Sequence, residues 1–186
     1  HHRRLNGLIA HLEAAFRLSG VSVGTVQINR ATVRRSDNPR LRFELRPGSA
    51  VRAEVDYRVN AEGLRGAETT LEKPAGVRRV AVLGDSIAFG YWVADQDGFP
   101  SQLEAMLNEA GGADGRVEVL NFGVPGYNLD QEIEALRAKA LAFAPDLVVG
   151  DVPPLAFQVA HEMGVPSIAI ANFTWDWIYE GYAEWR

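Results

Sequence analysis

Gly84, Asp85 and Ser86 stand together directly after the apolar run Val80–Leu83. A serine hydroxyl is a poor nucleophile unless a base, a water-poor site and donors for the developing oxyanion accompany it. A tight turn between a strand and a helix would expose the Ser86 hydroxyl and aim free backbone N–H groups at the same spot. Gly84 permits such a turn, and Asp85 can brace it. The alternative is that Asp85 or Ser86 only caps the next helix, which is the commoner role of an isolated Gly-Asp-Ser.

A second loop with glycines follows the next apolar run. Residues 120–128 read LNFGVPGYN, with two glycines and a proline before a helical pattern begins. Such a loop can bring a backbone N–H close to the serine. It can equally be a plain strand–helix turn, since Gly and Pro mark turns in every class of protein. The sequence alone leaves both interpretations open.

Hydrophobic periodicity predicts the elements that must position these loops. Helices are predicted over residues 5–18, 100–110, 129–143 and 155–163, and strands over 21–33, 41–45, 51–59, 79–83, 117–120, 147–149 and 167–171. From Val80 onward, strands alternate with helices, which predicts βαβ units, a parallel sheet and helices on both of its faces. Gly84-Asp85-Ser86, Asn121–Asn128 and Gly150-Asp151 would then meet at the carboxyl ends of the strands.

Composition narrows the function classes. The chain of 186 residues is 47% hydrophobic and 23% charged, which is typical of a globular domain and not of a disordered one. A net charge of −5 argues against a nucleic-acid partner. The basic clusters Arg3–Arg4, Arg34–Arg35 and Arg40–Arg46 are expected to be a solvated face. Without cysteine there is no disulfide framework or thiolate metal site, and we expect no metal and no cofactor.

No apolar stretch of this sequence approaches the ~18 residues of a membrane span, and no signal peptide is visible. We therefore expect a soluble protein, while its compartment and oligomeric state stay unknown. The chain starts without methionine, so it is interpreted as a fragment or as a chain whose N-terminus was processed or engineered. His1 and His2 are assigned no chemistry, because a two-histidine start is typical of a tag remnant.

From about Asn38 to Val149 the chain resembles bacterial members of the SGNH/GDSL hydrolase superfamily. The motifs that carry the resemblance are LRFELRPGS, VNAEGLRGAE, RRVAVLGDSIAFGYWV, DGFPSQLEAMLN, VEVLNFGVPGYN and APDLVV. The resemblance implies a three-layer α/β/α fold with a flavodoxin-like parallel sheet. It places the nucleophile at Ser86, whose own N–H contributes to the oxyanion hole. The other backbone donor falls on Gly126, with Gly123 as the alternative, and Gly84 and Asp85 support the first block.

Two further blocks of that family are missing. Where a Gly-x-Asn-Asp block should supply an asparagine to the oxyanion hole, the sequence reads VVGDVPPLAF. An ionised Asp151 cannot donate a hydrogen bond in its place. No Asp-x-x-His block supplies a base; the histidines are His1, His2, His11 and His161. His161 lies on a predicted helix beside Glu162. We expect it to be an exposed or capping residue rather than a substitute for the missing base.

The final segment has a different likeness. Residues 151–182 resemble part of the N-terminal domain of GT-B glycosyltransferase-like proteins, without the domain that binds the nucleotide sugar. The end of the chain is rich in aromatic residues, which we expect to pack in the fold or at an interface rather than to stack on a sugar: Trp175, Trp177, Tyr179, Tyr182 and Trp185. We therefore divide the chain into an N-terminal helix with a β-rich extension (1–78), an incomplete SGNH-like core (79–150) and a glycosyltransferase-like βα segment that completes the sheet (151–186).

These features favour an SGNH-type serine ester hydrolase by descent, acting on a small-molecule ester such as an acylated carbohydrate or lipid. Without a base, the chain is predicted to be a weak or inactive esterase. Two alternatives stay open. One is a glycosyltransferase-like sugar-binding fragment, and the other is a non-catalytic, chimeric or truncated α/β module.

Overall fold

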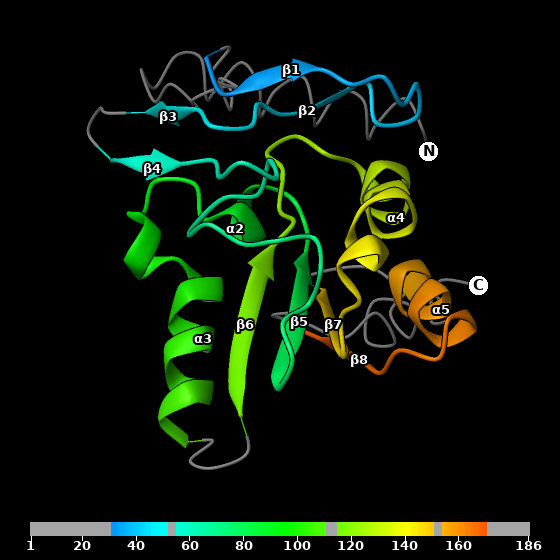
Figure 1. The fold of residues 1–186 in the computed structure, drawn as a ribbon. Helices are drawn as coiled ribbons and strands as arrows, with labels where there is room; N and C mark the ends of the chain where they lie inside the picture. The colour runs from blue at the N-terminus through cyan, green and yellow to red at the C-terminus, as the bar shows by residue number, and fades with distance from the viewer. Residues whose placement is uncertain (1–30, 52–54, 111–114, 151–153, 171–186) are drawn as a thin grey trace, which may run out of the picture.

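A four-stranded parallel sheet forms the centre of the computed structural model, which describes residues 31–51, 55–110, 115–150 and 154–170. Its strands are β5 (Val77–Leu83), β6 (Arg116–Asn121), β7 (Leu147–Gly150) and β8 (Ser167–Ala169). They lie in the order β6-β5-β7-β8, and every neighbouring pair is parallel. This is the order of a flavodoxin-like sheet, so the predicted parallel sheet is confirmed (Figure 1).

Helices cover both faces of the sheet. The helical segments are α2 (Ser86–Phe89), η1 (Asp95–Asp97), α3 (Phe99–Ala110), α4 (Leu129–Ala138), η2 (Ala140–Phe143) and α5 (Pro154–Glu162). On one face, Val80 and Val82 pack against Leu103 of α3. On the other, a core cluster joins the strands to α4, η2 and α5, and Leu136 is one of its fully buried members. The three-layer α/β/α fold is confirmed for the described residues.

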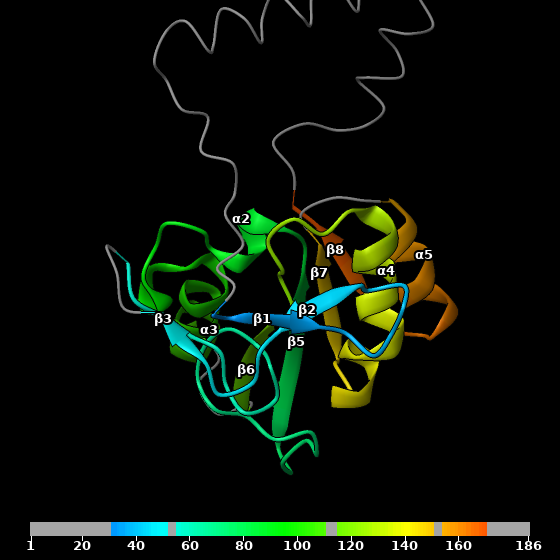
Figure 2. The same ribbon diagram turned by 90° about the horizontal axis from the view of Figure 1, so that it is seen from above.

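A layer of short strands precedes the sheet in the chain. β1 (Val33–Arg35) pairs antiparallel with β2 (Phe43–Leu45), and β3 (Ala50–Val51) pairs antiparallel with β4 (Tyr57–Arg58). This layer lies across the carboxyl end of the sheet, toward which β5 and β6 point (Figure 1). Seen from above, β1 and β2 run from the α3 side to the α4 side, with α2 beside them (Figure 2). The β layer therefore covers the edge at which sites form in such sheets.

Two predicted elements differ from the structure. The single strand expected over residues 51–59 is wrong, because β3 and β4 pair with each other and the chain must reverse between them. The single helix expected over 129–143 is also wrong: α4 ends at Ala138, Lys139 has a φ of −131°, and η2 follows. The break lets Ala140 and Phe143 turn into the core. The predicted helix 5–18 and nearly all of the predicted strand 21–33 lie outside the described residues.

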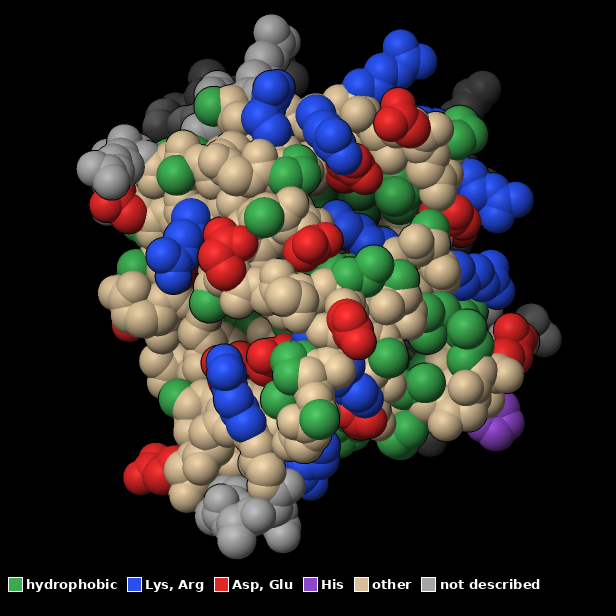
Figure 3. Space-filling model, viewed as in Figure 1, with side chains coloured by type: hydrophobic (Ala, Val, Ile, Leu, Met, Phe, Trp, Pro, Cys, Tyr) green, Lys and Arg blue, Asp and Glu red, His purple; other side chains and the backbone are tan. Residues whose placement is uncertain are grey.

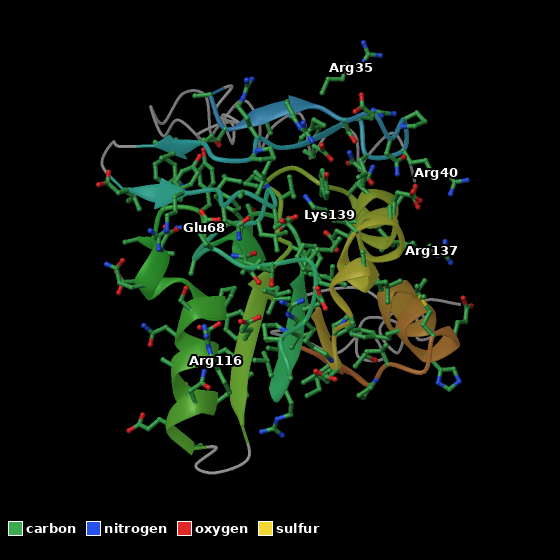
Figure 4. All side chains as sticks on the ribbon, viewed as in Figure 1. Arg35, Arg40, Glu68, Arg116, Arg137 and Lys139 are labelled. Atoms are coloured by element: carbon green, nitrogen blue, oxygen red, sulfur yellow. The ribbon has the colours of Figure 1, made fainter. Side chains whose placement is uncertain are left out.

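The basic residues of the β layer lie mostly in solvent, as the sequence predicted. Arg34 pairs with Glu44, and Arg40 pairs with Glu134 of α4. On the face in view, positive and negative side chains are interspersed (Figure 3). Arg40 and Arg137 extend outward, whereas Lys139 lies between α4 and the β layer (Figure 4). Burial lowers the pKa of Lys139, despite the nearby charge of Glu44. Among the described residues, no helix has the length and apolar character needed to cross a membrane.

A polar anchor holds the segment before β5 against the sheet. Arg79 is fully buried, and its guanidinium donates to Glu118 and to the carbonyls of Leu71, Thr70 and Phe143. Asp146 accepts hydrogen bonds at 2.7 Å from the Arg79 backbone N–H and from Lys73 Nζ. Burial by itself would raise the pKa of Asp146, but these hydrogen bonds and the neighbouring positive charges outweigh it and lower the pKa.

Because the folded pKa of Asp146 lies below its ordinary value of 3.8, its ionised form stabilises the fold above that value. This stability is lost as the pH falls through the folded pKa. We expect Asp146→Asn to lower the free energy of unfolding at pH 7 by about 1 kcal/mol or less, since the carboxyl group is half-exposed. The difference from wild type should shrink below pH 3.8 in urea titrations followed by circular dichroism. Glu109→Gln, an exposed residue of α3, is the control; a difference independent of pH would contradict the assignment.

Candidate active site

The turn between β5 and α2 presents Ser86 at the carboxyl end of the sheet. Gly84 has a φ of +152°, which an L residue rarely adopts, and Asp85 then caps α2 by accepting a hydrogen bond from Ile87 N at 3.1 Å. Ser86 is half-buried, and its hydroxyl lies 3.4 Å from Asp85 Oδ1, long for an O–H···O hydrogen bond. Asp85 is thus a helix cap, as the alternative interpretation predicted. The Ser86 hydroxyl is not used for capping.

The other end of α2 is fixed by a buried arginine that the sequence analysis did not single out. Arg65 has only 3% of its side chain exposed. Its guanidinium donates to the carbonyls of Phe89 (2.7 Å), Gly90 and Val93, and it forms an ion pair with Asp95 at 2.9 Å. It also lies over the Phe89 ring, 4.7 Å from the centroid. Arg65 therefore holds the single turn of α2 and the residues after it in one position.

The loop between β6 and α4 is attached to the same strand end. Phe122 N donates to Val82 O at 2.8 Å, and Val124 N donates to Gly84 O at 3.2 Å. Asn121 lies between the loop and α2, because its side chain accepts from Gly123 N and donates to Phe89 O. The two glycine-containing turns are thus side by side, as the topology predicted.

The two candidate glycines of this loop differ in what their backbones do. A Cβ on Gly123 would lie 2.3 Å from Phe89 N, and the Gly123 N–H already donates to Asn121 Oδ1 at 2.9 Å. Gly126 is exposed with a φ of +83°, and its N–H donates to no other residue of the described part of the chain. Gly123 therefore packs against α2 with its N–H already engaged, whereas the N–H of Gly126 has no partner among the described residues.

The Gly126 turn is anchored from both sides. Tyr127 N donates to Val124 O at 3.1 Å, so Pro125 and Gly126 occupy the central positions of a turn, the order that a type II turn prefers. The Tyr127 hydroxyl donates to Phe43 O of β2 at 2.7 Å, and burial raises the pKa of this phenol. Asn128 forms a capping box with Gln131 at the start of α4. The β layer therefore helps to set the position of Gly126.

The structure brings no histidine to Ser86 within its described residues. His161 lies exposed in the last turn of α5. α5 follows the carboxyl end of β7 and leads to the amino end of β8. His161, in its last turn, is therefore at the amino end of the strands, opposite to the carboxyl end where Ser86 lies. His1, His2, His11, Asp151 and the aromatic residues of 171–186 lie outside the described residues. In the part described, no group of His, Asp and Glu is arranged to hold a metal ion.

Comparisons with known proteins agree with this arrangement. Residues 82–150, which span β5 from Val82 to the end of β7, match the GDSL-like Lipase/Acylhydrolase family. The resemblance to SGNH/GDSL hydrolases is confirmed for this segment. The GDSL-like segment holds both turns of the candidate site and contains no histidine.

Similar proteins are matched only in part. AlinE4, an SGNH-hydrolase family esterase of known structure, is 16% identical with a TM-score of 0.41 over 52% of this chain and 60% of its own. Two variants of AlinE4 give the same values. L-arabinokinase from Arabidopsis thaliana is 39% identical over 54 residues, or 29% of this chain and 5% of that protein. The chain thus spans only part of each, and the glycosyltransferase-like character of residues 151–182 stays a prediction.

The backbone of α2 lies so close to Gly123 that adding one methyl group there is expected to destabilise the fold strongly. We expect Gly123→Ala to lower the free energy of unfolding by about 1–3 kcal/mol, because its Cβ would collide with the backbone of α2 rather than with a movable side chain. Gly98→Ala is the matched control, since its nearest neighbour would be 3.5 Å away. Urea unfolding of both variants measures the difference, and equal midpoints would show that the loop does not press on α2 in solution.

The burial of Arg65 predicts a second effect. Arg65→Met keeps most of the side chain's volume but removes the buried ion-pair partner of Asp95 and the guanidinium that donates to three carbonyls, so we expect a loss of roughly 3–5 kcal/mol in unfolding free energy. Arg58→Met is the control, because Arg58 lies 4.0 Å from the same aspartate but is 62% exposed, and about 0–1 kcal/mol is expected there. Similar losses in the two variants would contradict the central role of Arg65.

Proposed function

We propose that the chain carries the nucleophile half of an SGNH-type serine ester hydrolase, with Ser86 as the group that attacks the ester carbonyl. One observation carries the proposal: the Ser86 turn and the Gly126 turn are bonded to the same end of β5, through Val124 N and Gly84 O. The match of residues 82–150 to lipases and acylhydrolases supports the reaction class. Gly84 and Asp85 shape the turn, and neither takes part in bond making.

In the proposed reaction, Ser86 Oγ adds to the carbonyl carbon of the ester. The N–H groups of Ser86 and Gly126 hold the oxyanion of the tetrahedral intermediate, and its collapse releases the alcohol and leaves an acyl-serine. Water then hydrolyses the acyl group. A small-molecule ester, such as an acylated carbohydrate or lipid, is the proposed substrate class, and no cofactor is required.

Both steps need a base, which takes a proton from the serine hydroxyl and gives it to the leaving alcohol, and then takes one from water and returns it to Ser86 Oγ. Asp85 is poorly suited, because its carboxylate already accepts the Ile87 N–H that caps α2. His161 is at the far edge of the sheet. In serine hydrolases that lose a member of the triad, oxyanion donors and binding leave about 10³–10⁴-fold catalysis over water. We therefore propose that this chain is a weak esterase or an inactive one.

A missing base can be supplied from solution. We expect Ser86 to be acylated slowly by p-nitrophenyl acetate and to turn over poorly, and we expect added imidazole to raise the Ser86-dependent rate by about tenfold or more, since a base contributes 10²–10⁴-fold when ideally placed. Release of nitrophenolate gives the rate, and intact mass followed by peptide mapping locates the acetyl group. Subtracting the rate of Ser86→Ala removes the reaction of imidazole alone. Ser101→Ala, a serine of α3, should behave like wild type.

Two outcomes would contradict this proposal in different ways. Turnover at a normal enzymatic rate without imidazole, abolished in Ser86→Ala, would show that the chain has a base of its own. No acyl-enzyme at Ser86 under any condition would show that the turn is not a nucleophile site, and a non-catalytic α/β module would then be the better description.

A further inference from the structure

Two large apolar side chains stand in solvent directly after the proposed nucleophile. Ile87 is 75% exposed and Trp92 is 70% exposed. Ile87 follows Ser86 directly, and the chain folds back after α2, so that the N–H of Tyr91, the residue before Trp92, donates to Ser86 O at 2.9 Å. Leu129, which follows the Gly126 loop, is 38% exposed. Three exposed apolar side chains thus belong to the segments that follow the two turns.

The exposed position of Trp92 is imposed by its surroundings. Arg65 donates to Val93 O on one side of it, and Val93 N donates to Gly90 O at 3.3 Å. On the other side, the Tyr91 ring contacts the indole edge to face, with centroids 4.9 Å apart. Tyr91 itself packs against the core cluster that joins α2 to the Gly126 loop. The indole is therefore held against Tyr91, whose ring packs beside α2 and the Gly126 loop.

The fold gains little from a tryptophan at this position. Trp92 has a φ of +71°, a conformation in which glycine is unstrained and an L residue is not. With most of its surface in water, the side chain also contributes little to the core. A strained backbone and an exposed aromatic ring at the same residue favour a role in binding over a role in packing.

We propose that Ile87 and Trp92 form the surface that receives the acyl group of the ester, and that the chain prefers apolar acyl groups of several carbons, alkyl or aryl, to acetyl. The inference rests on the proposed function, since Ser86 must be the acylated residue for this surface to face an acyl chain. Arg65 is a positioning residue for it, because it fixes the carbonyls on both sides of Trp92. The surface is uncharged, so it offers no partner to an acidic acyl group.

The test replaces Trp92 by the residue that its backbone prefers. In Trp92→Gly, the rate of Ser86 acylation by p-nitrophenyl octanoate relative to p-nitrophenyl acetate, with imidazole present, should fall on the order of tenfold, because six methylenes lose an apolar partner. Its thermal midpoint should stay unchanged or rise, since strain is relieved. Met163→Ser, an equally apolar and 52% exposed residue at the opposite edge of the sheet, should keep the wild-type ratio.

A second experiment measures binding without acylation of Ser86. Saturation-transfer NMR compares 2-decanone with 2-butanone, two uncharged ketones without a leaving group, on Ser86→Ala and on Ser86→Ala with Trp92→Gly. Selective binding of 2-decanone to the first protein and not to the second supports the surface, even if no ester acylates Ser86 and the proposed function fails. Equal binding to both proteins overturns the inference. So does a Trp92→Gly variant that loses stability while its octanoate-to-acetate ratio is unchanged.

Discussion

The candidate site depends on how the carbonyl groups at the end of α2 are satisfied. A helix of one turn has few carbonyls bonded within itself, and a helix so short does not persist by its own propensity. Arg65 and Asn121 both donate to Phe89 O, and Arg65 also donates to the carbonyls of Gly90 and Val93. Asp95 balances the buried charge. The orientation of Ser86 at the start of α2 is thus set by groups at its end.

This dependence gives the β layer a direct part in the site. The backbone of Arg65 forms antiparallel β-bridges with Val59 on one side and with Asn121 of β6 on the other. Arg65 therefore joins the β layer to the central sheet. Tyr127 completes a second connection through Phe43 O. One buried cluster contains residues from β2, from the segment directly after β4, from α2 and from the Gly126 loop. Both turns of the site therefore rest on packing that a sheet with helices alone would not supply.

The sequence predicted what local patterns encode. Short apolar runs that alternate along the chain with helical patterns predicted the positions of β5, β6, β7 and β8. The Val-Pro-Gly-Tyr order of residues 124–127 agrees with the turn that is observed. The break at Lys139 was missed, because apolar spacing continues through it while the backbone turns. The role of Arg65 was missed for another reason. Its partners are carbonyls far along the chain, and hydrophobic periodicity does not indicate a hydrogen bond across the fold. The available sign was an arginine directly after Leu64 in the VNAEGLRG segment.

The same hydrogen bonds that make the Ser86 turn also limit what it can do. The Ser86 hydroxyl lies 3.4 Å from the carboxylate of Asp85, but that carboxylate caps α2 through Ile87 N. Taking the serine proton would neutralise the cap just as the helix must hold its N–H groups toward an oxyanion. Gly123 is restricted in a similar way, since its N–H is committed to Asn121. Asp85 and Gly123 thus use their groups to build the two turns, whereas the Ser86 hydroxyl and the Gly126 N–H take no part in building them. In the proposed reaction, a base therefore has to come from outside the Ser86 turn.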